Sequence, residues 1–282
     1  MRFGVSIWLW TSPVNNETIE HYLPKIAEMG FDTAEIPVED PSTLDSGRIK
    51  KALEENHLHV TTCAAMGEGR DLLSPDEKVR EQTMDYFRDS IDFANQVGAK
   101  RYVGPLYSEV GRLWKTTEEE KKEETRLLVS QLQELAEYAA EKDVVVCLEA
   151  LNRFETSFLN LTKDTVDIVR QVDHDNCQVM IDLFHAGIEE KSLGDAIRTA
   201  GSRLGHIQVA ENDRGTPGTG HFDWEDIASA LREIEYEGDV VIETFSQDNE
   251  LLAKAAAIWR PLASGPDELA TEGLAFLKKL MG

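Results

Sequence analysis

Short apolar runs rich in β-branched residues alternate along this chain with longer stretches that carry apolar residues at helical spacing. This alternation predicts β/α units, because parallel strands need a long crossover between them. We expect strands at residues 3–10, 33–38, 59–66, 101–107, 144–150, 178–182, 204–211 and 239–245. We expect helices at residues 18–29, 46–56, 76–97, 118–142, 162–172, 193–200, 224–234 and near 266–280.

The number of these units and the lack of a Pro- or Ser-rich linker predict one domain, 1–282, of the α/β class, folded as a single (β/α)8 TIM barrel. A doubly wound open sheet is the alternative. That fold usually has a glycine-rich turn after its first strand, whereas residues 7–13 read IWLWTSP. The barrel is therefore favoured.

The net charge of the chain limits the classes of partner that it is expected to bind. The net charge is −24, and such an acidic surface repels phosphate backbones and anionic lipids, so we expect neither nucleic acid nor a membrane as partner. We find no apolar stretch long enough to span a bilayer, and we expect residues 1–10 not to act as a signal peptide. The cysteines, Cys63, Cys147 and Cys177, lie in or beside apolar runs and are expected to be buried reduced thiols of a cytoplasmic protein.

Three apolar runs end on a carboxylate, namely Glu149, Asp182 and Glu243. Strand alternation turns each of them toward the barrel interior, and it places Gln208 on the same face near the end of its own strand, with His206 one layer deeper. The residues expected to pack outward against helices are Leu148, Ile181 and Ile242. Because barrel active sites lie at the carboxyl ends of the strands, these polar residues are candidates for one site.

Converging carboxylates repel one another unless a cation lies between them. Oxygen ligands from carboxylates and an amide favour Mg²⁺ or Mn²⁺ over Zn²⁺. The alternative is that each acid is a solvated strand-end residue that makes loop contacts. Their matching depth on separate strands favours the metal site.

Longer strings of the sequence carry a family resemblance. Residues 149–155 (EALNRFE), 181–185 (IDLFH), 205–220 (GHIQVAENDRGTPGTG) and 243–245 (ETF) resemble the ketose 3-epimerases of the xylose-isomerase-like barrel superfamily. That group includes the D-tagatose, D-psicose (allulose) and L-ribulose 3-epimerases, and the resemblance runs almost from end to end. It implies a metal-dependent enzyme that inverts C3 of a free ketose through a cis-enediolate.

The resemblance also implies roles for single residues. The residues implied as metal ligands are Glu149, Asp182, Gln208 and Glu243. The opposed acid/base pair is Glu149 and Glu243, and the implied substrate-binding residues are Glu155, His185 and Arg214. We expect Mn²⁺ as the cation, with Mg²⁺ or Co²⁺ as alternatives, a small-molecule sugar as partner, and a homo-oligomer, either a dimer or a tetramer.

One position departs from the family. Ketose 3-epimerases generally have histidine where Gln208 stands, whereas hydroxypyruvate isomerases resemble this chain there. An aldose–ketose isomerase of that kind is therefore the second interpretation, although the 212–220 loop matches the epimerases more closely. A metal-dependent DNA-repair endonuclease is disfavoured by the acidic charge, and a non-catalytic sugar-binding barrel would not need two opposed glutamates.

Further residues were considered beside these. Trp8 and Trp114 lie at or just beyond strand ends, where aromatic side chains can wall a sugar pocket, although core packing explains each equally well. Glu35 faces inward near the end of its strand and is expected to support a ligand by a hydrogen bond. Glu211 faces the helices and is expected to anchor a loop.

Overall fold

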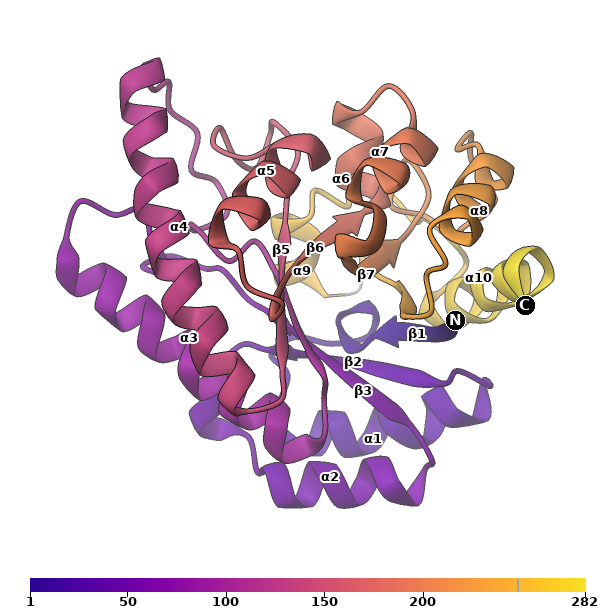
Figure 1. Ribbon diagram of the computed structural model, residues 1–282. Helices are drawn as coiled ribbons and strands as arrows, with labels where there is room; N and C mark the ends of the chain where they lie inside the picture. Colours follow the sequence, from indigo (N-terminus) through magenta and orange to yellow (C-terminus); the bar gives the residue numbers. More distant parts are fainter. Residues whose placement is uncertain (248) are drawn as a thin grey trace.

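The computed structural model describes residues 1–247 and 249–282, and within them eight parallel strands close into a barrel in chain order, β1 to β8. Figure 1 shows the helices arranged around this barrel, with the two chain ends on the same side of it. The strands are β1 (Arg2–Ser6), β2 (Thr33–Val38), β3 (His59–Ala64), β4 (Arg101–Gly104), β5 (Val145–Glu149), β6 (Cys177–Asp182), β7 (Leu204–Val209) and β8 (Asp239–Ile242). The predicted (β/α)8 barrel is confirmed.

The helices cover the outside of the barrel (Figure 1). They are α1 (Asn16–Glu28), α2 (Ser46–Glu55), α3 (Glu77–Val97), α4 (Glu118–Glu141), α5 (Thr162–Val172), α6 (Leu183–Glu189), α7 (Leu193–Ala200), α8 (Trp224–Glu233), α9 (Glu250–Ala255) and α10 (Pro266–Met281). Acidic caps begin several of them, as at α3, where the Asp76 side chain accepts a hydrogen bond from the Lys78 N–H. Each helix of the described chain is too short or too polar to cross a lipid bilayer.

The apolar residues divide between two packed regions, as strand alternation predicts. Leu148, Ile181 and Ile242 lie in the large core between sheet and helices. Cys63, Val103, Cys147 and Met180 form a separate small cluster within the barrel. All three cysteines are free and buried, as expected.

Several strands are shorter at their carboxyl ends than the sequence predicts. β1 ends at Ser6, and Ile7–Leu9 forms a 3₁₀ helix in place of the predicted continuation to residue 10. β3, β4, β7 and β8 likewise end two or three residues early. The apolar pattern continues past the ladder because the loops above the barrel also bury apolar side chains, such as Leu106 and Tyr107. Apolar periodicity therefore overestimates strand length at this end of a barrel.

Two helices were missed in the sequence. α6 follows β6 without a connecting loop, because the Asp182 side chain accepts a hydrogen bond from the Phe184 N–H and so caps the helix directly. α9 lies between β8 and α10, and it packs Leu252 and Ala253 with Phe245 and Ile258 in a small cluster of its own. Both helices lie at the carboxyl end of the barrel, where the candidate site is found.

Candidate active site

A cavity of about 630 Å³ opens at the carboxyl ends of the strands. Its lining combines polar and apolar side chains, which suits a small polyhydroxy molecule. The predicted site residues that line it are Trp8, Glu149, Glu155, His185, Gln208, Arg214 and Glu243. A second, smaller cavity of about 280 Å³ lies among the amino ends of the strands, with Arg2 and Arg101 on its wall, and it holds none of the candidate residues.

Glu149 and Glu243 line the larger cavity, and Asp182 lies buried beside it, in contact with His185 and Arg214 of the lining. Glu149 and Glu243 are each 5% exposed and Asp182 is 1% exposed. Burial, and after it the charge of neighbouring carboxylates, raises the pKa of all three, to about 6 for Asp182 and to about 8 for Glu243, although Arg214 acts in the opposite direction. The three groups are therefore costly to ionise together without added positive charge.

Asp182 uses its two carboxylate oxygens differently. Oδ1 accepts the 2.8 Å hydrogen bond from the Phe184 N–H that caps α6. Oδ2 faces the site, 3.5 Å from His185 Nε2 and 3.4 Å from Arg214 Nη2. One oxygen thus fixes the backbone while the other remains for a ligand.

Glu149, Asp182 and His185 form a group that could hold a cation, since one ligand atom from each lies within 4.8 Å of the others. Carboxylate oxygens around one ion stand at such separations, because each lies about 2.0–2.6 Å from the metal. The group differs from the predicted ligands, which include Gln208 and Glu243 but not His185. The hydrogen bonds of His185 and Gln208 therefore decide between the two sets.

His185 is a buried imidazole on α6 whose protonation follows from its partners. The Asn152 backbone N–H donates to His185 Nδ1 at 3.2 Å, and the Asn152 side chain also contacts Nδ1, at 2.8 Å. Burial, together with the nearby Arg214 guanidinium, holds the pKa of His185 well below its usual range. The Asn152 N–H favours the neutral ring with its proton on Nε2, because Nδ1 then accepts. In that tautomer Nε2 and Arg214 Nη2, which lie 3.3 Å apart, are both donors.

Gln208 is held by a residue of the opposite side of the barrel. Its Nε2 donates a 2.6 Å hydrogen bond to Glu35 Oε1, so the amide oxygen is the atom left for a ligand. Glu35 thus makes a hydrogen bond to a candidate ligand, as its inward position predicts. His206 lies one layer deeper, fully buried, with Nε2 2.9 Å from Glu35 Oε2.

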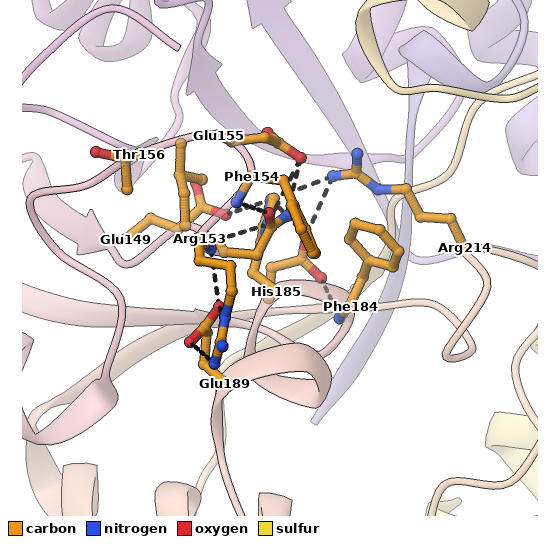
Figure 2. Close-up of polar contacts among 12 residues, drawn as sticks. Glu149, Arg153, Phe154, Glu155, Thr156, Phe184, His185, Glu189 and Arg214 are labelled. Carbon is orange, nitrogen blue, oxygen red and sulfur yellow. Dashed lines mark hydrogen bonds and ion pairs between the residues drawn. The ribbon is translucent and has the colours of Figure 1, made fainter. Parts of the chain in front are cut away.

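Arg214 brings positive charge to the carboxylates. Its Nη2 lies 3.1 Å from Glu243 Oε2 and 3.4 Å from Asp182 Oδ2, and it lies 3.3 Å from His185 Nε2. Its guanidinium carbon stands 4.4 Å from the centre of the Phe184 ring (Figure 2), and a second ring, that of Phe245, is 4.6 Å away. Two aromatic faces thus hold a cation against two acids.

The loop that carries Arg214 is anchored by Glu211, as predicted. The buried Glu211 carboxylate accepts hydrogen bonds from the N–H groups of Gly218 and Phe222, each at 3.0 Å, and from Trp224 Nε1 at 2.8 Å. Arg214 itself has a φ of 64°, an uncommon backbone conformation for a residue other than glycine. The anchor therefore holds the backbone in a turn that aims the guanidinium into the site.

Glu155 belongs to a second loop, which follows β5. The loop is tied to α6 because Arg153 makes paired hydrogen bonds to Glu189, at 2.9 and 2.8 Å, shown in Figure 2. Asn152 Nδ2 donates to Glu155 Oε1 at 2.9 Å, and the same carboxylate oxygen lies 3.9 Å from His185 Nδ1. Glu155 therefore reaches the cavity beside His185, while Phe154 is 70% exposed at the rim.

The two tryptophans that were predicted to wall a sugar pocket differ in position. Trp8 lines the cavity, and its indole N–H donates to Glu39 Oε1 at 2.8 Å. Trp114 is 48% exposed and lies over the Arg112 guanidinium, 4.0 Å from the ring centre, and it does not line the cavity in the described part of the chain. Its loop turns outward before the indole can reach the site.

Sequence reasoning missed several residues of the cavity. Glu39 follows β2 and orders the loop after β1, since it also accepts from Ser12 Oγ at 2.7 Å and from the Val14 N–H at 3.0 Å. Its position one residue beyond a strand end is the signal that could have identified it. Leu252, Ala255 and Ala256 contribute from α9 and its end, a segment in which the sequence predicts no helix.

Comparison with known proteins identifies the family to which this barrel belongs. A family model described as the xylose isomerase-like TIM barrel matches residues 23–280. A D-psicose 3-epimerase of Ruminiclostridium cellulolyticum is 34% identical over 274 residues, which cover 95% of this chain and 92% of the relative.

Solved structures agree with this match. The D-psicose 3-epimerase of Clostridium cellulolyticum H10 with D-tagatose has a TM-score of 0.90 at 31% identity, covering 100% of this chain and 99% of that one. The D-allulose 3-epimerase of Methylomonas sp. in complex with D-allulose has a TM-score of 0.93 at 27% identity, covering 99% of this chain and 97% of that one. The chain is an isomerase that belongs to the ketose 3-epimerases of the xylose isomerase-like TIM barrel family.

Proposed function

We propose that this protein inverts C3 of a free ketose with the help of one divalent cation, and that Glu149 and Glu243 exchange the C3 proton. The observation that carries the proposal is the order of side chains across the cavity. Glu149 Oε1 lies 3.8 Å from His185 Nε2, which is followed by Arg214 Nη2 at 3.3 Å and Glu243 Oε2 at a further 3.1 Å. The two buried glutamates thus stand at the two ends of this series of polar contacts.

The donor set fits a hard divalent cation. Glu149, Asp182 and Glu243 supply three buried carboxylates whose pKa values are raised first by burial and then by neighbouring acids, and Gln208 adds an amide oxygen. Oxygen donors of this kind suit Mn²⁺ or Mg²⁺. We propose Mn²⁺ as the resident ion, with Mg²⁺ or Co²⁺ as substitutes.

The contacts of His185 Nδ1 support a role for this residue with the substrate and favour Gln208 as the metal ligand. To ligate a cation through Nε2, His185 would have to carry its proton on Nδ1, where it would meet the Asn152 N–H. As the structure holds it, Nε2–H is a hydrogen-bond donor facing the cavity. A donor suits a carbonyl or hydroxyl oxygen of the sugar.

The protein residues divide the chemistry between them. When bound, the cation would polarise the ketose carbonyl and lower the cost of removing the adjacent proton. One glutamate takes the C3 proton and leaves an enediolate, and the other glutamate returns a proton to the opposite face, which inverts the centre. The exchange needs one glutamate ionised, to accept the C3 proton, and the other protonated, to return one.

His185, Arg214 and Glu155 then orient the substrate. The Nε2–H of His185 and the guanidinium of Arg214 donate to oxygens beside the carbonyl, where negative charge develops. Glu155 accepts from a sugar hydroxyl. A cation would compete with Arg214 for Glu243 and Asp182, so we expect the guanidinium to turn from these acids toward the substrate when the site is loaded.

A screen of free ketoses with Mn²⁺, followed by chromatography, tests the proposal. We expect the C3 epimer to form with Mn²⁺, and we expect its formation to stop with EDTA and return when Mn²⁺ is added in excess. Hydroxypyruvate is included because the glutamine at position 208 resembles its isomerases. Turnover of hydroxypyruvate without any ketose epimer would instead support the isomerase, and EDTA-independent binding without turnover would support a sugar-binding barrel.

The variant Gln208→His tests the fourth ligand. Imidazole is a good ligand for Co²⁺ and Mn²⁺, so we expect the variant to fold, to keep binding metal and to shift its activation from Mg²⁺ toward Co²⁺. The measurement is the rate with each ion over a concentration series. An activation profile identical to that of the parent would show that Gln208 does not contact the ion.

A further inference from the structure

We propose that Glu35 is a positioning residue for the metal site: it fixes the side-chain amide of Gln208 so that the oxygen, and not the nitrogen, faces the cation. This inference rests on the proposed function, in which Gln208 is a metal ligand. Glu35 lies on β2 and Gln208 on β7, and both are buried, at 0% and 2% exposed. The Gln208 Nε2–H donates to Glu35 Oε1 at 2.6 Å.

The need for such a residue follows from the chemistry of an amide. The two ends of a glutamine side chain have nearly the same shape, but only the oxygen can bind a hard cation. A carboxylate only accepts hydrogen bonds, so it selects the amide orientation in which nitrogen points toward it. The reversed amide would set its oxygen against Glu35 Oε1 at hydrogen-bond distance. Gln208 therefore presents Oε1 to the site only because Glu35 holds Nε2.

Glu35 is itself held in place by two further residues, one on β3 and one on β7. Thr61 Oγ1 on β3 donates to Glu35 Oε2 at 3.2 Å, and His206 Nε2 on β7 lies 2.9 Å from the same oxygen, at ion-pair distance but not as an aligned hydrogen bond. Thr61 and His206 are as deeply buried as Glu35, at 1% and 0% exposed. With Oε2 occupied in this way, Oε1 has a fixed direction across the barrel interior.

The strand order explains why this contact supports the site without belonging to it. In the closed barrel β2 and β7 are separated by β1 and β8, so the Glu35–Gln208 hydrogen bond crosses the interior. Gln208 lines the cavity, whereas Glu35 does not. Glu35 contacts the site through Gln208, and its charge in addition helps to raise the pKa of Glu243.

The first test is a Mn²⁺ titration of the folded protein without substrate, in which the signal of free Mn²⁺ is followed by electron paramagnetic resonance. We expect Glu35→Met, which removes the acceptor at similar volume, to weaken Mn²⁺ binding by about 10–100-fold. Thr61→Val is the matched control, since it removes a different partner of Glu35 and keeps the Gln208 contact. It should stay within about threefold of the parent, well below the effect of losing the acceptor.

The second test exchanges the two side chains and remains informative if Glu35→Met fails to fold. In Glu35→Gln/Gln208→Glu, the new Gln side chain donates to the new carboxylate, whose other oxygen faces the metal. Gln208→Glu made alone instead sets two carboxylates against each other. The quantity compared is the change in Mn²⁺ affinity that Gln208→Glu causes in each background. We expect this change to be more favourable in the Glu35→Gln background than in the parent by at least about tenfold, which is the usual cost of losing a supporting contact. An equal change in both backgrounds would overturn the inference.

The same titrations separate this inference from the proposed function. If the parent binds Mn²⁺, Asp182→Ala does not, and Glu35→Met matches the parent, then the metal site stands and the role of Glu35 is wrong. If the parent itself binds no divalent cation, the proposed function fails and the inference falls with it. Weakened binding in Glu35→Met together with the background dependence of Gln208→Glu supports both.

Discussion

Replacing either opposed glutamate, as Glu149→Gln or Glu243→Gln, is expected to lower kcat for C3 epimerisation by about 10²–10⁴-fold. Glutamine keeps an oxygen that can face the cation, but it can neither take the C3 proton nor return one. Both residues are buried carboxylates with a raised pKa, in keeping with a role in proton exchange. The measurement is the initial rate of epimer formation at saturating ketose and Mn²⁺.

Two other glutamates serve as controls for these substitutions. Glu54 lines the smaller cavity at the opposite end of the barrel, so Glu54→Gln should leave the rate unchanged. Glu155 lines the active-site cavity but is placed to bind a sugar hydroxyl, so Glu155→Gln should raise KM more than it lowers kcat. If Glu149→Gln or Glu243→Gln retained more than a tenth of the parent rate, that residue would not be one of the two bases.

The second large effect is expected at Asp182. Its Oδ2 faces the site while Oδ1 caps α6, so Asp182→Ala should lose both metal binding and part of the helix stability. We expect metal affinity to fall by at least about 100-fold, beyond the usual cost of removing a supporting contact. The loss of the cap should cost about 1 kcal/mol of free energy of unfolding.

Asp182→Asn separates the two roles of the residue. The asparagine oxygen can still accept from the Phe184 N–H, so thermal stability should stay near that of the parent. The charge that faces the cation is gone, so metal content after dialysis should fall. If this variant held as much metal as the parent, measured by plasma mass spectrometry, Asp182 would not be a ligand.

The sequence predicted the barrel and most of the site for a physical reason. In β5, β6 and β8 a carboxylate ends or directly follows a buried apolar run, and strand alternation allows only one direction for it. The same periodicity also predicts inward positions for Gln208 and Glu35. It cannot show that they touch, since that contact joins strands 173 residues apart across the barrel.

The parts that were missed are those set by loops. The tautomer of His185 depends on Asn152, whose loop is placed by the Arg153–Glu189 pair, and no periodic pattern encodes that contact. Trp114 was considered for the pocket wall because it lies near a strand end, but its loop carries it onto Arg112 instead. Strand parity gives direction only as far as the ladder extends.

The central claim is that two bases on opposite sides exchange the C3 proton with solvent, and epimerisation in D₂O followed by proton NMR tests it most directly. A proton removed by one glutamate is not the one returned by the other, so the account predicts deuterium at C3 of the product and none at C1. An aldose–ketose isomerase would instead exchange a hydrogen at C1 of the ketose, so deuterium would appear at C1 of the ketose or at C2 of the aldose. Formation of the C3 epimer with full retention of the original C3 hydrogen would contradict the two-base account.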